Sequence, residues 1–202
     1  MLLSSRISAA FDIARRAHAG QVRKGNGVPY LSHPMAVAAL VMESGGSEDQ
    51  ICAALLHDVL EDAGPAWRDE IETALGPHVL LLVEACTDGL PDEHGHKESW
   101  RTRKNRYIEH LSHIDRVTDE ALLICAADKL HNLRSLLIEL QAEGPDALLH
   151  FVKEEPTLSG KTAATLWYYD SLVRLFEIRR LATAGLLRRT LENVRRLVED
   201  IV

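Results

Sequence analysis

The stretch ALLICAADKLHNLRSLLIEL, residues 121–140, decides the fold class of this chain. Apolar residues recur in it every three or four positions, the period of an α-helix, and they cover more than one face, so this helix is expected to be buried. The rest of the chain is rich in alanine and leucine and has few alternating or β-branched runs. The sequence therefore predicts an all-α fold, a bundle of about 8–10 helices of ordinary length, with residues 121–140 crossing its middle.

Further helices are expected on both sides of this segment, because apolar periodicity resumes between turn-rich stretches. They cover residues 5–19, 34–44, 47–62 with a capping box at its start, 67–87 with a break near Gly76, 100–112, a long segment from about Gly160, and roughly 186–200. The turn-rich stretches at 87–99 and 142–159 are too short to separate domains. We therefore expect residues 1–202 to form one domain.

The composition is that of an ordinary globular protein, with 46% hydrophobic and 26% charged residues. The formal net charge of -7 excludes a duplex nucleic-acid binder, since that function needs many basic side chains against phosphates. A small anionic ligand remains compatible with this charge if basic residues cluster locally.

The cysteines and the N-terminal sequence bear on the cellular compartment. Cys52, Cys86 and Cys125 lie in apolar helical sequence without the spacing of a metal site, which indicates reduced core residues. No secretory leader is recognisable, and no stretch approaches the ~18 apolar residues of a membrane span. We expect a cytoplasmic protein without a membrane partner, and the sequence leaves its oligomeric state open.

Polar residues interrupt the apolar helical sequence at three places, always as His or Asp. His57 and Asp58 directly follow two leucines, Asp128 follows seven apolar residues, and His33 precedes Pro34, the expected start of a helix. Burying an ionised aspartate is costly unless a metal ion or another partner compensates it. Two imidazoles and two carboxylates without a thiolate form a ligand set that leaves positions for water and substrate, and this set favours Mn²⁺ over Fe²⁺, Mg²⁺ or Zn²⁺.

Each of these residues also has a purely structural interpretation. His57 and Asp58 could be core residues that hydrogen-bond to neighbours, Asp128 could form a buried salt bridge with Lys129, and His33 could cap a helix. Three such interruptions in one chain favour the metal.

Helical spacing places further polar residues beside the expected ligands. Glu61 lies four residues beyond His57 and Asp62 four beyond Asp58, so both carboxylates could reach a water held by the metal. The alternative is an ordinary exposed helix end.

A second set of polar residues follows Asp128 at helical intervals. Asn132 lies one turn beyond it and Ser135 two turns beyond it, so they form a stripe that could hold a nucleotide.

Three motifs then match one family: HAGQVRKGNGVPYLSHP at 18–34, LLHDVLEDAG at 55–64 and AADKLHNLRS at 126–135. In order and spacing they resemble the hydrolase domain of the RelA/SpoT-homologue proteins, especially the small stand-alone alarmone hydrolases of the HD phosphohydrolase superfamily. The resemblance is clear over about residues 5–140. It implies an HD-type helical bundle on which the helices of about 160–200 pack.

The resemblance also implies roles for individual residues. It assigns Mn²⁺ to His33, His57, Asp58 and Asp128, and catalysis to Glu61 and Asp62. It further assigns nucleotide contacts to Arg23, Lys24, Tyr30, Asn132 and Ser135, although the first two could be ordinary loop charges. His18 and His131 are expected to support the site rather than bind the metal. The loop 88–100 departs from the longer family members, so the role of the basic residues from Lys97 to Arg106 stays open.

The implied activity is hydrolysis of the 3′-pyrophosphate of ppGpp or pppGpp, which gives GDP or GTP and pyrophosphate. One alternative is the same chemistry on an adenosine alarmone or on the 2′-phosphate of NADPH, because the metal centre does not recognise the base. Another is a module that senses a nucleotide without turnover, although the presence of Glu61 and Asp62 disfavours it. A small nucleotide is the expected partner in each case.

Overall fold

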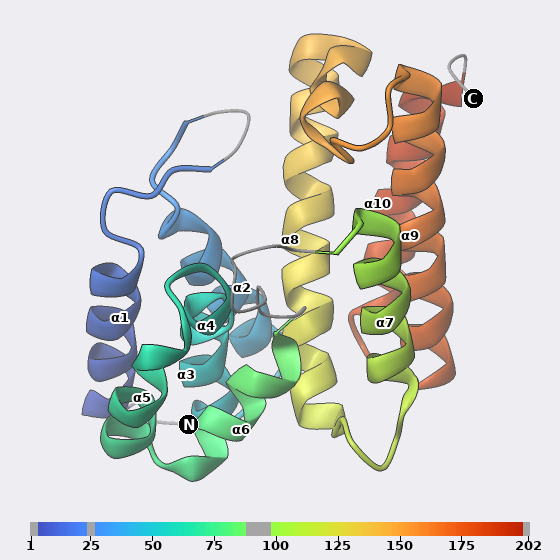
Figure 1. Cartoon of the computed structure of the whole chain (residues 1–202). Helices are drawn as coiled ribbons and strands as arrows, with labels where there is room; N and C mark the ends of the chain where they lie inside the picture. The colour runs from blue at the N-terminus through green and yellow to red at the C-terminus, as the bar shows by residue number, and fades with distance from the viewer. Residues whose placement is uncertain (1–3, 24–26, 88–97, 200–202) are drawn as a thin grey trace.

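The computed structural model describes residues 4–23, 27–87 and 98–199, and helices dominate all three segments (Figure 1). The one extended pairing among these residues is an isolated antiparallel bridge between Val22 and Pro29. The predicted all-α fold is confirmed.

Ten α-helices and two 3₁₀ helices follow one another in the described residues. In chain order they are α1 (Ser5–Ala17), α2 (Ser32–Glu43), α3 (Glu48–Leu56), α4 (Val59–Asp62), η1 (Pro65–Trp67), α5 (Arg68–Leu75), α6 (Pro77–Cys86), α7 (Trp100–Ser112), α8 (Asp119–Glu143), η2 (Gly144–His150), α9 (Leu158–Ile178) and α10 (Ala184–Leu197).

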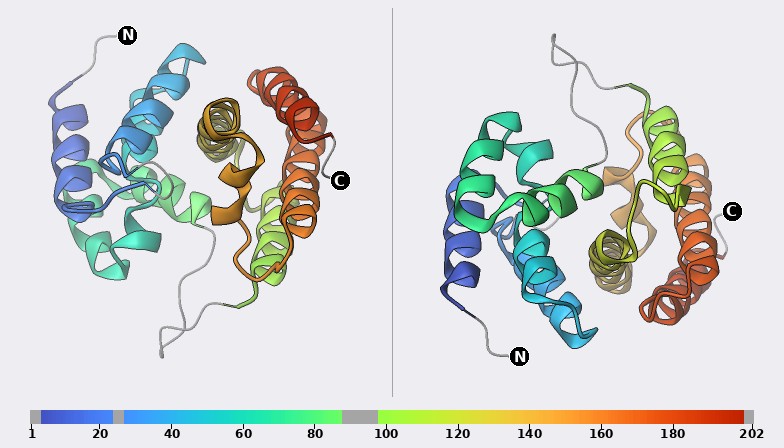
Figure 2. Two further views of the ribbon diagram at one scale, coloured as in Figure 1. Left: turned by 90° about the horizontal axis from the view of Figure 1, so that it is seen from above. Right: turned by 90° about the horizontal axis from the view of Figure 1, so that it is seen from below.

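The long helix α8 runs through the middle of the molecule, as predicted. Helices α1 to α6 lie on one side of it, and α7, α9 and α10 lie on the other (Figures 1 and 2). The hydroxyl of Thr118 caps its N-terminus by accepting a hydrogen bond from the backbone N–H of Ala121. Six of the seven residues 121–127 are buried, so this end of α8 is the centre of the core.

Helix boundaries on the N-terminal side follow local signals. The predicted capping box forms, since Ser47 and Gln50 satisfy each other's backbone N–H groups at the start of α3. The predicted break at Gly76 is also present: its φ of 89° is in the left-handed region, and Pro77 then begins α6.

One predicted boundary on this side is wrong, because the expected helix over 47–62 is interrupted. Helix α3 ends at Leu56 and α4 begins at Val59, with His57 and Asp58 in the turn between them. In an uninterrupted helix, side chains of adjacent residues project about 100° apart. The turn lets the imidazole and the carboxylate point to the same place.

The start of the second helix also differs from the prediction. Helix α2 begins at Ser32, so His33 lies inside its first turn rather than before it. A proline is tolerated there, because the N–H groups of a first turn have no acceptor within the helix. Pro34 therefore did not mark the helix start.

The C-terminal boundaries were predicted approximately. Part of the expected turn-rich stretch 142–159 is helical, since α8 reaches Glu143 and a 3₁₀ helix follows it to residue 150. Short 3₁₀ segments leave no apolar period in a sequence. The last helix spans 184–197 rather than 186–200, and residue 200 lies outside the described residues.

The three cysteines are free and buried, as expected for core residues. Within the described residues, no helix combines the length and the apolar character that crossing a membrane requires.

Candidate metal centre

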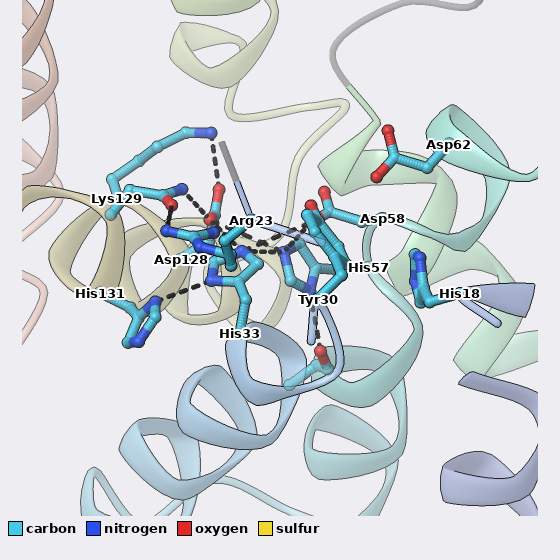
Figure 3. A network of polar contacts seen from close by, with 12 residues as sticks. His18, Arg23, Tyr30, His33, His57, Asp58, Asp62, Asp128, Lys129 and His131 are labelled. Carbon is cyan, nitrogen blue, oxygen red and sulfur yellow. Dashed lines mark hydrogen bonds and ion pairs between the residues drawn. The ribbon is translucent and has the colours of Figure 1, made fainter. Parts of the chain in front are cut away.

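Four polar side chains from three parts of the chain meet beside α8 (Figure 3). His33 comes from the first turn of α2, His57 and Asp58 from the turn between α3 and α4, and Asp128 from the middle of α8. His33, His57 and Asp128 are buried, with 1%, 2% and 6% of each residue exposed, and Asp58 is partly exposed. The structure thus brings together the four residues that the sequence singled out as metal ligands.

The donor atoms of these residues are close neighbours. Nε2 of His33 lies 3.2 Å from Nε2 of His57, 3.3 Å from Oδ2 of Asp58 and 3.1 Å from Oδ1 of Asp128. Nε2 of His57 lies 3.1 Å from the same oxygen of Asp58 and 3.6 Å from that of Asp128.

These distances fit a bound metal ion. Metal–ligand bonds of about 2.0–2.3 Å separate adjacent ligand atoms by about 2.8–3.8 Å in octahedral or tetrahedral geometry. The five distances given above fall in this interval, and the donor atoms of His33, His57 and Asp58 all lie within 4.8 Å of one another. These three residues therefore fit a divalent cation, and Asp128 lies beside them with Oδ1 close to both imidazoles.

Each imidazole is oriented by its other ring nitrogen. Nδ1 of His57 lies 2.8 Å from the carbonyl oxygen of Ala54, to which it can only donate, so Nε2 presents its lone pair to the cluster. Nδ1 of His33 lies 2.7 Å from Nδ1 of His131. Burial lowers the pKa of His131 to about 4, so this ring is neutral near pH 7 and can accept the hydrogen bond from His33. His131 thus supports the cluster, as expected from the sequence.

The two carboxylates are held by other side chains. The hydroxyl of Tyr30 donates to Oδ2 of Asp58 at 2.5 Å. Asp128 accepts from Lys129 at 2.6 Å and from the amide of Asn132 at 2.5 Å. Partners of this kind fix the direction in which a ligand points.

The electrostatics of the cluster favour a positive charge at its centre. Burial disfavours a charged imidazole, but the carboxylates of Asp58 and Asp128 outweigh it and raise the pKa of His57 well above its ordinary value. Burial likewise disfavours a charged Asp58, but the two imidazoles hold its pKa well below the ordinary value. A site that holds a proton this strongly also attracts a metal ion, which replaces the proton on binding.

The acidic pair lies one turn beyond the cluster. Glu61 is half-buried and Asp62 is exposed, and both belong to the four-residue helix α4. Oδ2 of Asp62 accepts a hydrogen bond of 2.8 Å from the side-chain amide of Gln21. This bond ties Asp62, the last residue of α4, to Gln21 in the loop after α1.

Three of the predicted nucleotide contacts lie together on one face of α8. The guanidinium of Arg23 donates to Oδ1 of Asn132 at 3.0 Å and contacts the hydroxyl of Ser135 at 3.5 Å. Tyr30 is a neighbour of this group, since its ring centroid is 6.0 Å from the guanidinium carbon of Arg23. Lys24 lies outside the described residues.

Two basic residues of α7 contact side chains outside the cluster. Arg101 lies over the ring of Trp167 at 3.3 Å, and Arg106 pairs with Glu98 at 2.6 Å. Lys97 lies outside the described residues.

The sequence profile of the HD domain matches residues 10–148. The chain belongs to the HD-domain family. The matched range includes all four candidate ligands and the acidic pair, and the resemblance found from the three motifs is confirmed.

Two relatives of this HD domain have names that state an enzymatic activity. SpoT of Escherichia coli, a bifunctional (p)ppGpp synthase/hydrolase, is 37% identical over 134 residues, which are 65% of this chain and 18% of SpoT. Human MESH1, a guanosine-3′,5′-bis(diphosphate) 3′-pyrophosphohydrolase, is 37% identical over 138 residues, which are 66% of this chain and 70% of MESH1. The chain thus spans about a fifth of the length of SpoT.

Solved structures share the fold of this HD domain. A metazoan orthologue of SpoT, reported to hydrolyse ppGpp, superposes with a TM-score of 0.70 and 25% identity over 97% of both chains. The protein lmo0812 of Listeria monocytogenes superposes with a TM-score of 0.64 and 24% identity over 81% of this chain. The fold similarity therefore extends past the matched range into the C-terminal helices.

The sequence did not identify two residues that contact the candidate site. Gln21 contacts Asp62, and Lys129 contacts Asp128, which the sequence analysis had considered only as a structural salt bridge. Gln21 lies in a polar loop, where no burial conflict marks one residue above its neighbours. Its position three residues after His18 in the first motif was the available signal.

Proposed function

We propose that this HD domain hydrolyses the 3′-pyrophosphate of ppGpp or pppGpp. The observation that carries the proposal is the convergence of His33, His57, Asp58 and Asp128 beside the acidic pair. The names of SpoT and MESH1, each 37% identical to this chain over the aligned residues, support this substrate.

The proposed cofactor is one Mn²⁺ ion held by His33, His57, Asp58 and Asp128. Two nitrogen and two oxygen donors without a thiolate support a harder cation, and they leave positions for other ligands. When bound, such an ion polarises a phosphoryl oxygen and lowers the pKa of a water molecule.

The reaction adds water to the phosphorus attached to the 3′ oxygen and breaks the bond between these two atoms. Glu61 and Asp62 would orient the attacking water and accept its proton, while the 3′ oxygen takes up a proton as it leaves. Carboxylates are suited to this role because they are ionised near neutral pH and accept hydrogen bonds.

The nucleoside would lie along the face of α8 that carries Asn132 and Ser135. Arg23 already contacts both side chains, so it is held at this face with a positive charge available for a phosphate or for stacking on a base. Tyr30 and Lys24 are the further contacts that we propose.

The test is product analysis with purified protein loaded with Mn²⁺. The panel contains ppGpp, pppGpp, the adenosine counterpart and NADPH, and pyrophosphate and phosphate are measured separately. We expect pyrophosphate from the guanosine compounds. Faster release from the adenosine compound, or phosphate from NADPH, would reassign the substrate, and tight binding of ppGpp without any product would indicate a sensor.

Two further proposals concern the whole chain. We infer that residues 1–202 act as one domain, which is supported by the packing of α9 and α10 on α8. We also infer a cytoplasmic location, which the three free cysteines support.

A further inference from the structure

We propose that His18 and Gln21 are positioning residues that hold the catalytic carboxylate of Asp62 through a hydrogen-bond chain of fixed direction. The inference rests on the proposed function, because it concerns how the acidic pair is held for the reaction. It adds two residues outside the candidate ligand set, and both of them contact Tyr30, whose hydroxyl donates to Asp58.

The chain of contacts runs from a buried ring to an exposed carboxylate. Nδ1 of His18 lies 2.7 Å from Oε1 of Gln21, and Nε2 of Gln21 lies 2.8 Å from Oδ2 of Asp62. Only 4% of His18 is exposed to solvent, whereas Asp62 is exposed. Gln21 thus connects His18, the residue that follows α1, with the exposed end of α4.

The direction of both hydrogen bonds follows from the chemistry of the end group. An ionised carboxylate only accepts, so the Gln21 atom facing Asp62 must be the amide nitrogen. The amide oxygen then faces His18, which must carry its proton on Nδ1. The opposite tautomer would place two lone pairs against each other at 2.7 Å.

The far side of the His18 ring agrees with this assignment. Among the described residues, nothing forms a hydrogen bond with the buried Nε2 of His18. An N–H on that side would be a buried donor without a partner, which is costlier than a lone pair. The contacts therefore place the proton of the His18 ring on Nδ1, facing Gln21.

Asp62 needs such support because its own helix is weak. It is the last residue of α4, which has four residues, and an exposed carboxylate at such an end samples several rotamers. Gln21, by contrast, is fixed on two sides, since its carbonyl accepts from the backbone N–H of Tyr30 at 2.9 Å and its N–H donates to the carbonyl of His18 at 3.1 Å.

His18 also contacts the residue that holds a candidate ligand. Its ring centroid is 4.8 Å from that of Tyr30, whose hydroxyl donates to Asp58. In the view of Figure 3, His18 and Asp62 lie on the side of Asp58 away from Asp128. One buried ring thus supports the acidic pair through Gln21 and the metal cluster through Tyr30.

The first experiment is a double-mutant cycle on the full chain loaded with Mn²⁺. Gln21→Leu keeps the volume but removes both hydrogen bonds, and we expect kcat to fall by about 10- to 100-fold with little change in KM, as for a misplaced catalytic group. In an Asp62→Ala background the same substitution should cost nothing further, because Gln21 acts only through Asp62. An equal loss in both backgrounds overturns the proposal.

The matched control is Gln141→Leu, at an exposed position near the C-terminal end of α8. It should leave kcat, KM and bound Mn²⁺ unchanged. Gln21→Leu should retain bound Mn²⁺ and its melting temperature. If it loses the metal, Gln21 supports the ligand cluster rather than Asp62, and the proposal is wrong.

A second measurement does not depend on the substrate. The ¹⁵N chemical shifts of histidine rings distinguish the Nδ1–H tautomer from the Nε2–H tautomer. For His18 we expect Nδ1–H in the wild type and a mixture in Gln21→Leu. If the wild type releases no pyrophosphate but shows this tautomer, the proposed function fails while the hydrogen-bond chain stands; an Nε2–H tautomer in the wild type overturns the chain itself.

Discussion

Within the residues that the structure describes, a buried and a surface cluster of histidine and carboxylate side chains differ in what they can hold. The buried cluster consists of His33, His57, Asp58 and Asp128. The surface cluster consists of His78 on α6, with Asp49 on α3 at 2.9 Å and Glu120 on α8 at 3.2 Å. Both join helices that are distant in sequence.

The two clusters differ in the direction of their contacts. In the surface cluster each nitrogen of His78 faces a different carboxylate, so the contacts are separate pairs that point away from each other. Asp49 is also neutralised by Arg6 at 2.6 Å. In the buried cluster two Nε2 atoms lie 3.2 Å apart and share the same carboxylate oxygens.

The comparison teaches that residue types alone do not make a metal site. Water solvates the surface cluster, in which 48% of the His78 side chain is exposed, so its charges need no ion. The buried cluster is much less exposed, since 1% of the His33 side chain and 20% of the Asp58 side chain are accessible, and the donors of His33, His57 and Asp58 all lie within 4.8 Å of one another. Donor atoms that lie close together and are buried distinguish the candidate metal centre from the surface cluster.

The largest expected effect comes from removing one carboxylate from each cluster, which tests whether only the buried cluster binds the metal. Asp58→Ala should abolish both bound Mn²⁺ and turnover, because a ligand of a cluster with few donors is lost. The matched change Asp49→Ala should leave both intact. Metal analysis beside a pyrophosphate-release assay measures the pair, and an Asp58→Ala protein that still carries Mn²⁺ would remove Asp58 from the ligand set.

The next largest effect is expected from Glu61→Gln, which distinguishes a metal ligand from a residue of the acidic pair. Glu61→Gln keeps the shape and removes the charge, so Mn²⁺ should remain while turnover falls by roughly 10²–10⁴-fold, the range for lost acid–base assistance. Metal content and kcat are measured on the same sample. Loss of the metal would make Glu61 a ligand, and an unchanged rate would exclude it from catalysis.

Removing the metal should lower the stability of the wild type but not that of Asp58→Ala. Binding to the folded state alone stabilises the chain by about 2.7 kcal/mol at a free metal concentration of 100 times Kd. Chelation should therefore lower the melting temperature of the wild type by roughly 5–10 °C at this chain length. Asp58→Ala should melt at the same temperature with or without chelator; a matching shift in that variant would mean that the ion binds elsewhere.

Two positions on α8 should differ according to what they touch. Asn132 donates to the candidate ligand Asp128, whereas Ser135 contacts Arg23. Asn132→Ala should weaken Mn²⁺ by about 10–100-fold and, at saturating Mn²⁺, raise KM more than it lowers kcat. Ser135→Ala should raise KM only. Losses of kcat and kcat/KM by one factor at unchanged KM would argue against a nucleotide-binding role for Asn132.

The smallest effect is expected in the surface cluster. The hydrogen bond to Asp49 raises the pKa of His78 above the ordinary value of 6.5, so the charged ring stabilises the fold. This stabilisation is complete below the unfolded pKa and is lost as pH rises through the higher folded pKa. For exposed groups it stays below about 1 kcal/mol. Denaturation of His78→Ala across pH 5–9 should show a slightly flatter dependence than the wild type, and a steeper one would contradict the sign.

Much of the fold could be predicted from the sequence, because the signals are local. The apolar period of 121–140 predicted the central helix, Ser47 and Gln50 predicted a capping box, and Gly76 predicted a break. Each depends on residues within one or two helical turns. The interruption at His57 and Asp58 could not be predicted, since both residues keep right-handed backbone angles and neither is a glycine or a proline that would mark a turn.

The sequence by itself determined which side chains need compensation: His33, His57, Asp58 and Asp128 stand in apolar helical segments. Only the tertiary structure decided which residues support them, as with Arg23 and Asn132, which are 109 positions apart, or Gln21 and Asp62, which are 41 apart. The physical reason is that helical geometry relates residues three or four positions apart, whereas the packing of α2, α3 and α8 brings distant segments to one point. A polar residue in a loop is solvated and has no cost of burial that would mark it in the sequence. Its role therefore becomes visible only through the side chain that it contacts.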